Sequence, residues 1–155
     1  MTIENQVCTF EQASKLTSYG LDRRKAYFSW YLPTVKRNGG KVKPQVSSHN
    51  PCDMRIFTVE TLPAFTAVEL GLFLPEELYG RGTNMQLHQF QYCEKGFIVD
   101  YRLYYESGGD EKKRIPETIM HAKTEAQVRA DMLIYLLENK IVDAEYMNRR
   151  CQFIQ

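Results

Sequence analysis

The sequence predicts an α+β fold in which an antiparallel sheet of three or more strands has helices packed on it. Two observations lead to this class. Residues 97–105, "FIVDYRLYY", alternate apolar and polar side chains, which is the two-residue period of a half-buried strand. Several apolar segments elsewhere begin with helix-capping residues. The chain has 155 residues, a length that suits one core, so we expect a single globular domain over residues 1–155.

Three helices are predicted from Thr-x-x-Glu/Gln capping boxes. In each box the Thr hydroxyl accepts a hydrogen bond from the backbone three residues on, while the longer side chain reaches back to the Thr backbone. The first helix should cover residues 10–19 and end in a Schellman motif, with Gly20 in the left-handed position. The boxes pair Thr9 with Gln12, Thr66 with Glu69, and Thr124 with Gln127.

A strand and a long polar loop should follow the first helix. Residues 26–32, "AYFSWYL", are rich in aromatic residues and stop at Pro33, as expected for a strand. Residues 33–54 contain many turn-forming residues, which permit a short hairpin and otherwise indicate a binding loop or a mobile segment. A short strand is expected at residues 55–60.

The helix that begins after Thr66 is expected to turn Val68, Leu72 and Phe73 toward the core. Pro75 should prevent it from continuing unkinked. The acidic pair Glu76 and Glu77 then favours a new helix start, because negative charge is stabilised at a helix N-terminus.

Three consecutive antiparallel strands are predicted in the middle of the chain, at residues 85–93, 97–105 and 115–121. A tight turn, "EKG", joins the first two. Pro116 cannot donate to a β-ladder, so the third strand should begin there or lie at an edge of the sheet.

The last long helix contains an apolar run, "MLIYLL" at residues 132–137, that leaves it no polar side. One face should lie on the sheet. The opposite face, near Tyr135, needs a second cover from the N-terminal helix, the C-terminal segment or another subunit. A short helix opened by Asp143 should follow and present Tyr146 and Met147. Tyr135, Tyr146 and Met147 are therefore the candidate residues of a partner interface, with core burial as the alternative.

No catalytic or metal-binding pattern is visible in the sequence. The four cysteines form no Cys-x-x-Cys pair, and His49, Cys52 and Asp53 are one loose cluster without a partner pair at ligand spacing. "YGRGTN" at residues 79–84 lacks the third glycine of a dinucleotide loop and reads as a turn. We therefore predict no metal, no cofactor and no enzymatic activity. A hydrolase or nuclease is the third hypothesis, and it requires that His49, Cys52 or His88 meets a carboxylate in a pocket of the fold.

A nucleic-acid site is the second hypothesis. Four cations flank "NGG" in residues 35–43, near three aromatic residues that could stack on bases. A solvated hairpin tip explains the same pattern. The cations are Lys36, Arg37, Lys41 and Lys43, and the aromatic residues are Tyr27, Trp30 and Tyr31.

The formal net charge of +1 is too small for a whole-molecule attraction to polyanions, so such a site would be local. No apolar run approaches the ~20 residues of a membrane span, and the first ten residues lack the features of a signal peptide. We expect a cytoplasmic protein without a membrane partner.

The segments "CTFEQASKL", "FTAVELGLFLP", "AKTEAQVRADMLIYLLENK" and "EYMNRR" together resemble uncharacterised small proteins of prophages and mobile elements in gut bacteria. The resemblance implies a phage-like setting and assigns no activity to any residue. The sequence thus favours a non-enzymatic interaction or adaptor module, with a protein partner or a second copy of the chain. The alternative is a nucleic-acid-binding module.

Overall fold

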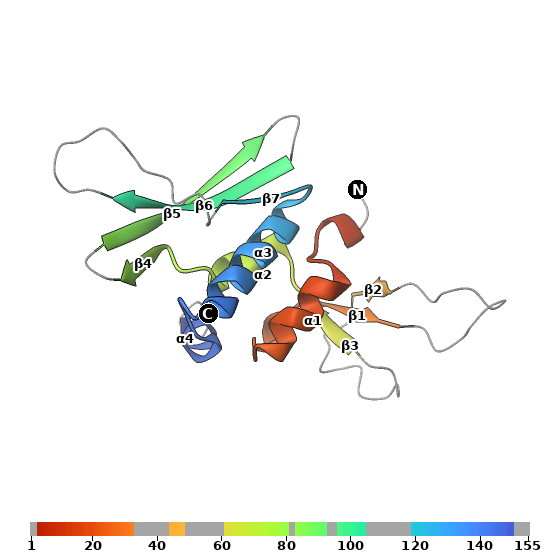
Figure 1. The fold of residues 1–155 in the computed structure, drawn as a ribbon. Helices are drawn as coiled ribbons and strands as arrows, with labels where there is room; N and C mark the ends of the chain where they lie inside the picture. Colours follow the sequence, from red (N-terminus) through yellow and green to blue (C-terminus); the bar gives the residue numbers. More distant parts are fainter. Residues whose placement is uncertain are drawn as a thin grey trace.

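The predicted α+β class is confirmed by the computed structural model, which describes residues 3–32, 44–48, 61–80, 83–92, 96–104 and 119–150 (Figure 1). Within these ranges the strands form two antiparallel sheets, β2-β1-β3 and β4-β5-β6-β7. The helices are α1 (Phe10–Ser18), α2 (Ala67–Phe73), α3 (Glu125–Glu138) and α4 (Ala144–Arg150), with short 3-10 helices η1 (Ile3–Asn5) and η2 (Arg23–Lys25). The strands are β1 (Phe28–Tyr31), β2 (Gln45–Ser47), β3 (Thr61–Ala64), β4 (Glu77–Gly80), β5 (Thr83–Tyr92), β6 (Gly96–Tyr104) and β7 (Met120–Ala122).

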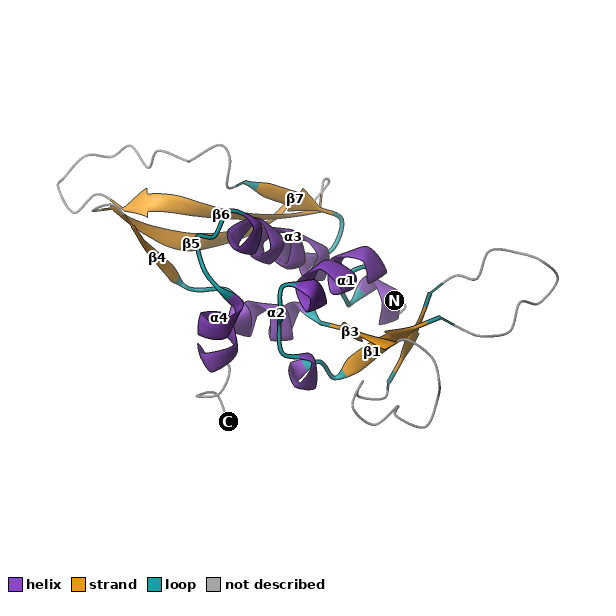
Figure 2. Ribbon diagram, turned by 60° about the horizontal axis from the view of Figure 1, so that its bottom comes forward, coloured by secondary structure: helices purple, strands orange, loops and turns teal. Residues whose placement is uncertain are grey.

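Helix α3 lies at the centre of the fold. It contacts β6 and β7 on its sheet side and α1 and α2 on its other sides, and α1 in turn packs on β3 of the smaller sheet (Figures 1 and 2). Met132, Leu133 and Leu136 are fully buried, and Ile134 and Leu137 nearly so. The cover that the apolar run requires therefore comes from the same chain.

The capping boxes predicted at Thr9 and Thr66 are present in full, and Thr124 caps α3 through the amide of Gln127. Gln12 has a second role, since its side-chain amide also donates to the Asp131 carboxylate at 2.6 Å. The cap of α1 and the contact between α1 and α3 thus share one side chain. Burial raises the pKa of Asp131 above its ordinary value, although the Gln12 hydrogen bond opposes the shift.

The antiparallel order of the meander is confirmed in β5, β6 and β7, with Gln89 opposite Val99 and Val99 opposite Met120. Strand β7 overlaps the predicted third strand only at residues 120–121, and the start expected at Pro116 lies outside the described residues. Val99 and Tyr101 are fully buried, as the alternation predicts. Asp100, between them on the other face, is also fully buried, so this part of β6 is enclosed on both sides.

Two expectations for residues 66–80 were wrong. Val68 is 73% exposed, whereas Phe73 is buried and Leu72 packs partly against the core as expected; α2 also buries Leu70. Glu77 begins strand β4 rather than a helix, because pairing with β5 supplies its backbone partners and Leu78 enters the core. The strand expected at residues 55–60 and most of the 33–54 loop lie outside the described residues.

Gly71 allows close contact between α2 and α3. A Cβ atom there would collide with the guanidinium of Arg129, which donates to the Ala67 carbonyl and pairs with Glu125 at 2.6 Å. A glycine in a helix interior costs about 1 kcal/mol relative to alanine. Here it leaves space for a charged side chain that links the two helices.

Helices α1 and α3 end in the same Schellman geometry with different residues. The amide of Leu21 donates to the Leu16 carbonyl at 3.1 Å, with Gly20 at φ 89°. The amide of Ile141 donates to the Leu136 carbonyl at 2.9 Å, with Lys140 at φ 54°. Lys140 therefore occupies a backbone conformation that favours glycine.

We predict opposite effects of exchanging the residue type at these two positions. Lys140→Gly should raise the free energy of unfolding by about 0.5–1 kcal/mol, because it relieves the left-handed strain. Gly20→Ala should lower it by about 1 kcal/mol through backbone strain, since the nearest side-chain atom to the new Cβ is 3.9 Å away. Urea unfolding of the two variants and the wild type measures both changes. Two effects of the same sign would contradict this account.

Candidate functional site

Two surface cavities are the candidate sites among the described residues. One, of about 400 Å³, lies beside the starts of α2 and α3, where Thr66 and Thr124 line it. Both Thr hydroxyls accept the capping hydrogen bonds of their helices. The second cavity, of about 340 Å³, lies between the start of β4 and helix α4 and is called the α4 pocket below. It is lined by Pro75, Glu77, Leu78, Ile141, Val142, Asp143, Tyr146 and Arg149.

The first wall of the α4 pocket follows from the end of α3. The left-handed turn at Lys140 reverses the chain and places Ile141 and Val142 beside the cavity. Ile141 is 40% exposed, whereas Val142 packs against the core. The pocket thus has an apolar wall with an accessible outer edge.

Helix α4 supplies the opposite wall. Asp143 opens the helix as predicted, since its carboxylate accepts from the Tyr146 amide at 2.6 Å and its carbonyl accepts from the Met147 amide at 3.2 Å. Tyr146 and Arg149 are three residues apart and therefore share one face of the helix. Both line the pocket, and the Tyr146 side chain is 40% exposed.

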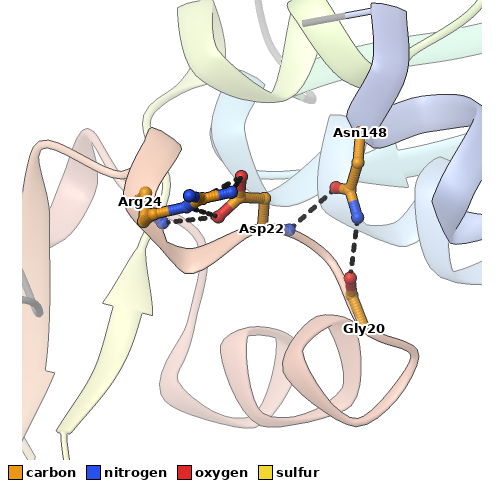
Figure 3. Close-up of polar contacts among 4 residues, drawn as sticks. All are labelled: Gly20, Asp22, Arg24 and Asn148. Atoms are coloured by element: carbon orange, nitrogen blue, oxygen red, sulfur yellow. Dashed lines mark hydrogen bonds and ion pairs between the residues drawn. The ribbon is translucent and has the colours of Figure 1, made fainter. Parts of the chain in front are cut away.

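Two contacts fix how α4 lies on the fold. Met147 is fully buried in the core. The Asn148 side chain accepts from the Asp22 amide at 2.8 Å and donates to the Gly20 carbonyl at 2.9 Å, as Figure 3 shows. In the same turn, hydrogen bonds from Arg24 hold the pKa of Asp22 below its ordinary value. Asn148 thus joins α4 to the turn after α1.

The remaining wall is the segment between α2 and β4. The hydroxyl of Tyr101, on β6, donates to the Pro75 carbonyl at 2.6 Å. Burial raises the pKa of this phenol, so the hydroxyl keeps its proton and remains a donor. Glu77 and Leu78 follow Pro75 at the start of β4, with Leu78 buried beneath the pocket surface.

The three residues predicted for a partner interface have different environments. Tyr146 is exposed at the α4 pocket, and Tyr135 is half-buried against the core. Met147 is fully buried, so its side chain is not available to a partner in this conformation and instead anchors α4. Ile141 and Arg149 belong to the same surface as Tyr146 and were missed, because only the left-handed turn at Lys140 brings Ile141 back to α4.

The residues proposed for nucleic-acid binding are only partly described. Lys36, Arg37, Lys41 and Lys43 lie outside the described residues. Trp30 is buried, and its indole donates to the Cys8 carbonyl at 2.9 Å, so it cannot stack on a base. Tyr31 is half-buried and its hydroxyl donates to Gln45, whereas Tyr27 is 69% exposed.

The described residues include no cluster suited to a metal ion, and the cysteine among them is buried. In this part of the chain no group of three or more His, Cys, Asp and Glu side chains could hold a metal ion. Cys8 is completely buried, and burial raises the pKa of its thiol to about 12, so it does not form the reactive thiolate near neutral pH. His49, Cys52 and Asp53 lie outside the described ranges.

No helix in the described ranges has the length and apolar character needed to cross a lipid bilayer. Comparison of the chain with known proteins gives no matching family model, no matching curated protein and no matching solved structure. The resemblance to prophage proteins therefore stays a prediction.

Asn148 offers a direct test of how the α4 pocket is held. Asn148→Ala should lower the free energy of unfolding by about 1–3 kcal/mol, because it removes two hydrogen bonds to backbone groups of the turn after α1. Asn139→Ala is the control, since that side chain makes an exposed bond to the carbonyl of Tyr135 within its own helix. Thermal and urea unfolding compare the variants. A change within about 0.5 kcal/mol, as for ordinary surface sites, would contradict the proposed role of Asn148.

Proposed function

We propose that the protein is a non-enzymatic, cytoplasmic interaction module that binds a protein partner through the α4 pocket. The observation that carries the proposal is the exposure of Tyr146 and Ile141 around a cavity of about 340 Å³, beside Arg149. Tyrosine and arginine are enriched among the residues that dominate protein–protein binding energies.

The character of the surface favours a protein partner over a small metabolite. The cavity is near the lower end of the volumes that hold small ligands, at roughly 300–1,000 Å³. It is bordered by exposed side chains, and a partner surface can cover these while one of its own side chains enters the cavity. The resemblance to prophage proteins adds the proposal of a phage-like setting.

A site-specific photocrosslinker tests this function. We expect p-benzoylphenylalanine at position 146 to give an adduct with one identifiable protein in the native cell. The same probe at Tyr19, which is 37% exposed and outside the pocket, should not give that adduct. The purified partner should bind at least about tenfold more weakly to Tyr146→Ser, as for other central tyrosines.

The outcomes of the crosslinking experiment either overturn the proposal or identify the partner. Equal adducts at positions 146 and 19, or unchanged affinity of Tyr146→Ser, would overturn the proposal. An adduct between two copies of the chain, with a dimer in light scattering, would identify the partner as a second subunit.

A nucleic-acid-binding module is the second candidate. It is favoured by the exposure of Tyr27, two residues after the three consecutive cations Arg23, Arg24 and Lys25. The opposing evidence is the Glu69 carboxylate, which accepts from the Tyr27 backbone amide at 2.6 Å and adds negative charge beside the backbone of this residue.

Gel shifts with single-stranded DNA and RNA over a series of salt concentrations test the second candidate. If it is correct, binding weakens as salt rises, and both Tyr27→Ala and a fourfold alanine variant at Lys36, Arg37, Lys41 and Lys43 bind more weakly. Tyr146→Ser is the control and should bind as the wild type does. No shift at low salt would exclude this candidate.

A further inference from the structure

Helix α4 is held on the fold by few side chains. Met147 is its one fully buried residue, whereas α3 buries eight. Asn148 adds the two hydrogen bonds to the turn after α1. Because the free energy gained by burial scales with the apolar area removed from water, α4 is attached much more weakly than α3.

The turn that leads into α4 adds a cost to its docked position. Lys140 has a φ of 54°, a left-handed conformation that is unfavourable for a residue with a Cβ atom. The chain reversal that brings α4 back onto the fold requires this conformation. If α4 leaves the fold, Lys140 is free to adopt an ordinary backbone conformation.

The other end of α4 carries a second cost. The Nε atom of Arg150 is buried and has no hydrogen-bond partner among the described residues. Such a donor has lost its hydrogen bond to water without a replacement. Burial raises the pKa of the Tyr101 phenol, and the nearby positive charge of Arg150 opposes this shift. The guanidinium thus lies near the buried layer beneath α4, and movement of α4 into solvent hydrates it.

We infer that α4 detaches from the fold as a unit, about the turn at residues 139–143, while α1, α2, α3 and both sheets stay folded. Openings of this kind involve contiguous cooperative segments and need less free energy than global unfolding. Met147 and Asn148 favour the docked state, whereas Lys140 and Arg150 favour the open state. Detachment removes one wall of the α4 pocket and exposes Met147.

Detachment is also a switch for partner binding, and this part of the inference rests on the proposed function. Tyr146 and Arg149 line the pocket only while α4 is docked. A partner that contacts them therefore binds the docked state alone. Binding then suppresses detachment, because a ligand shifts an equilibrium toward the state that it binds.

Native-state hydrogen exchange of the 155-residue chain tests detachment without a partner. We expect the amides of residues 147–150 to be about tenfold or more less protected than those of Leu133 and Leu136 in α3, and all four to share one opening. Low urea concentrations should accelerate exchange less in α4 than in α3, because opening of α4 exposes less surface.

Two results of this measurement would contradict detachment. Equal protection and equal urea dependence of α3 and α4 would show that α4 opens only when the whole protein unfolds. Protection that falls progressively toward residue 150 would show fraying from one end instead of release of the whole helix.

Four variants test the named contacts. Lys140→Gly and Arg150→Met should each slow α4 exchange by roughly two- to fivefold, since each removes a cost of docking. Asn148→Ala should accelerate it by about tenfold through the loss of two hydrogen bonds. Arg149→Met is the matched control. It makes the same chemical change at a side chain that is 62% exposed, so exchange should change by less than about twofold.

Unchanged protection of α3 confirms that each variant is folded. Equal effects of the two methionine variants, or no effect of Lys140→Gly, would overturn the inference.

The failure of this inference can be told apart from the failure of the proposed function. If α4 opens only with the whole protein, detachment is wrong, and crosslinking at position 146 still decides the interaction function. If α4 detaches but no protein is captured at position 146, the interaction function is wrong and detachment stands. The purified partner, at saturation, should slow α4 exchange by about tenfold or more. Unchanged exchange would overturn the switch.

Discussion

The enclosure of α3 is the constraint on which the rest of the structure depends. Its last two turns have apolar side chains in every direction, so exposure of any face would place apolar surface in water. The four-stranded sheet covers one side, and α1 and α2 cover the others. The two sheets lie on opposite sides of this helical layer (Figure 2). Each neighbouring element therefore has a defined position around one helix.

Polar contacts give this apolar arrangement its orientation. Gln12 joins α1 to α3, and Arg129 joins α3 to α2 over Gly71. Asn148 does the same for α4 and the turn after α1. Burial of apolar surface is not directional, whereas each of these hydrogen bonds requires one relative placement of two elements. The last of these contacts, made by Asn148, fixes the position of α4 and therefore of the pocket wall that α4 provides.

The helices and the meander could be predicted because their signals, capping residues and alternating side chains, are local in the sequence. The other strands and the pocket could not, because they depend on contacts between distant segments. The caps at Thr9, Thr66 and Thr124 set helix starts within the chain itself. Strand β3 was not predicted. It contains Pro63, which cannot donate to a ladder, and this is tolerated because β3 lies at the edge of its sheet among the described strands. Among the candidate site residues, Tyr146 was foreseen, but Ile141 and Glu77 meet it only through the fold.

The position of α4 also has a consequence for the order in which the molecule is made. One wall of the pocket comes from residues 144–150, and Asn148 binds a turn that is translated 126 residues earlier. While α4 is still inside the ribosome, the pocket of the growing polypeptide lacks this wall and is incomplete. If the α4 pocket binds a partner as proposed, a nascent chain can recruit that partner only after residues 144–150 have left the ribosome, and shorter nascent chains cannot compete for it.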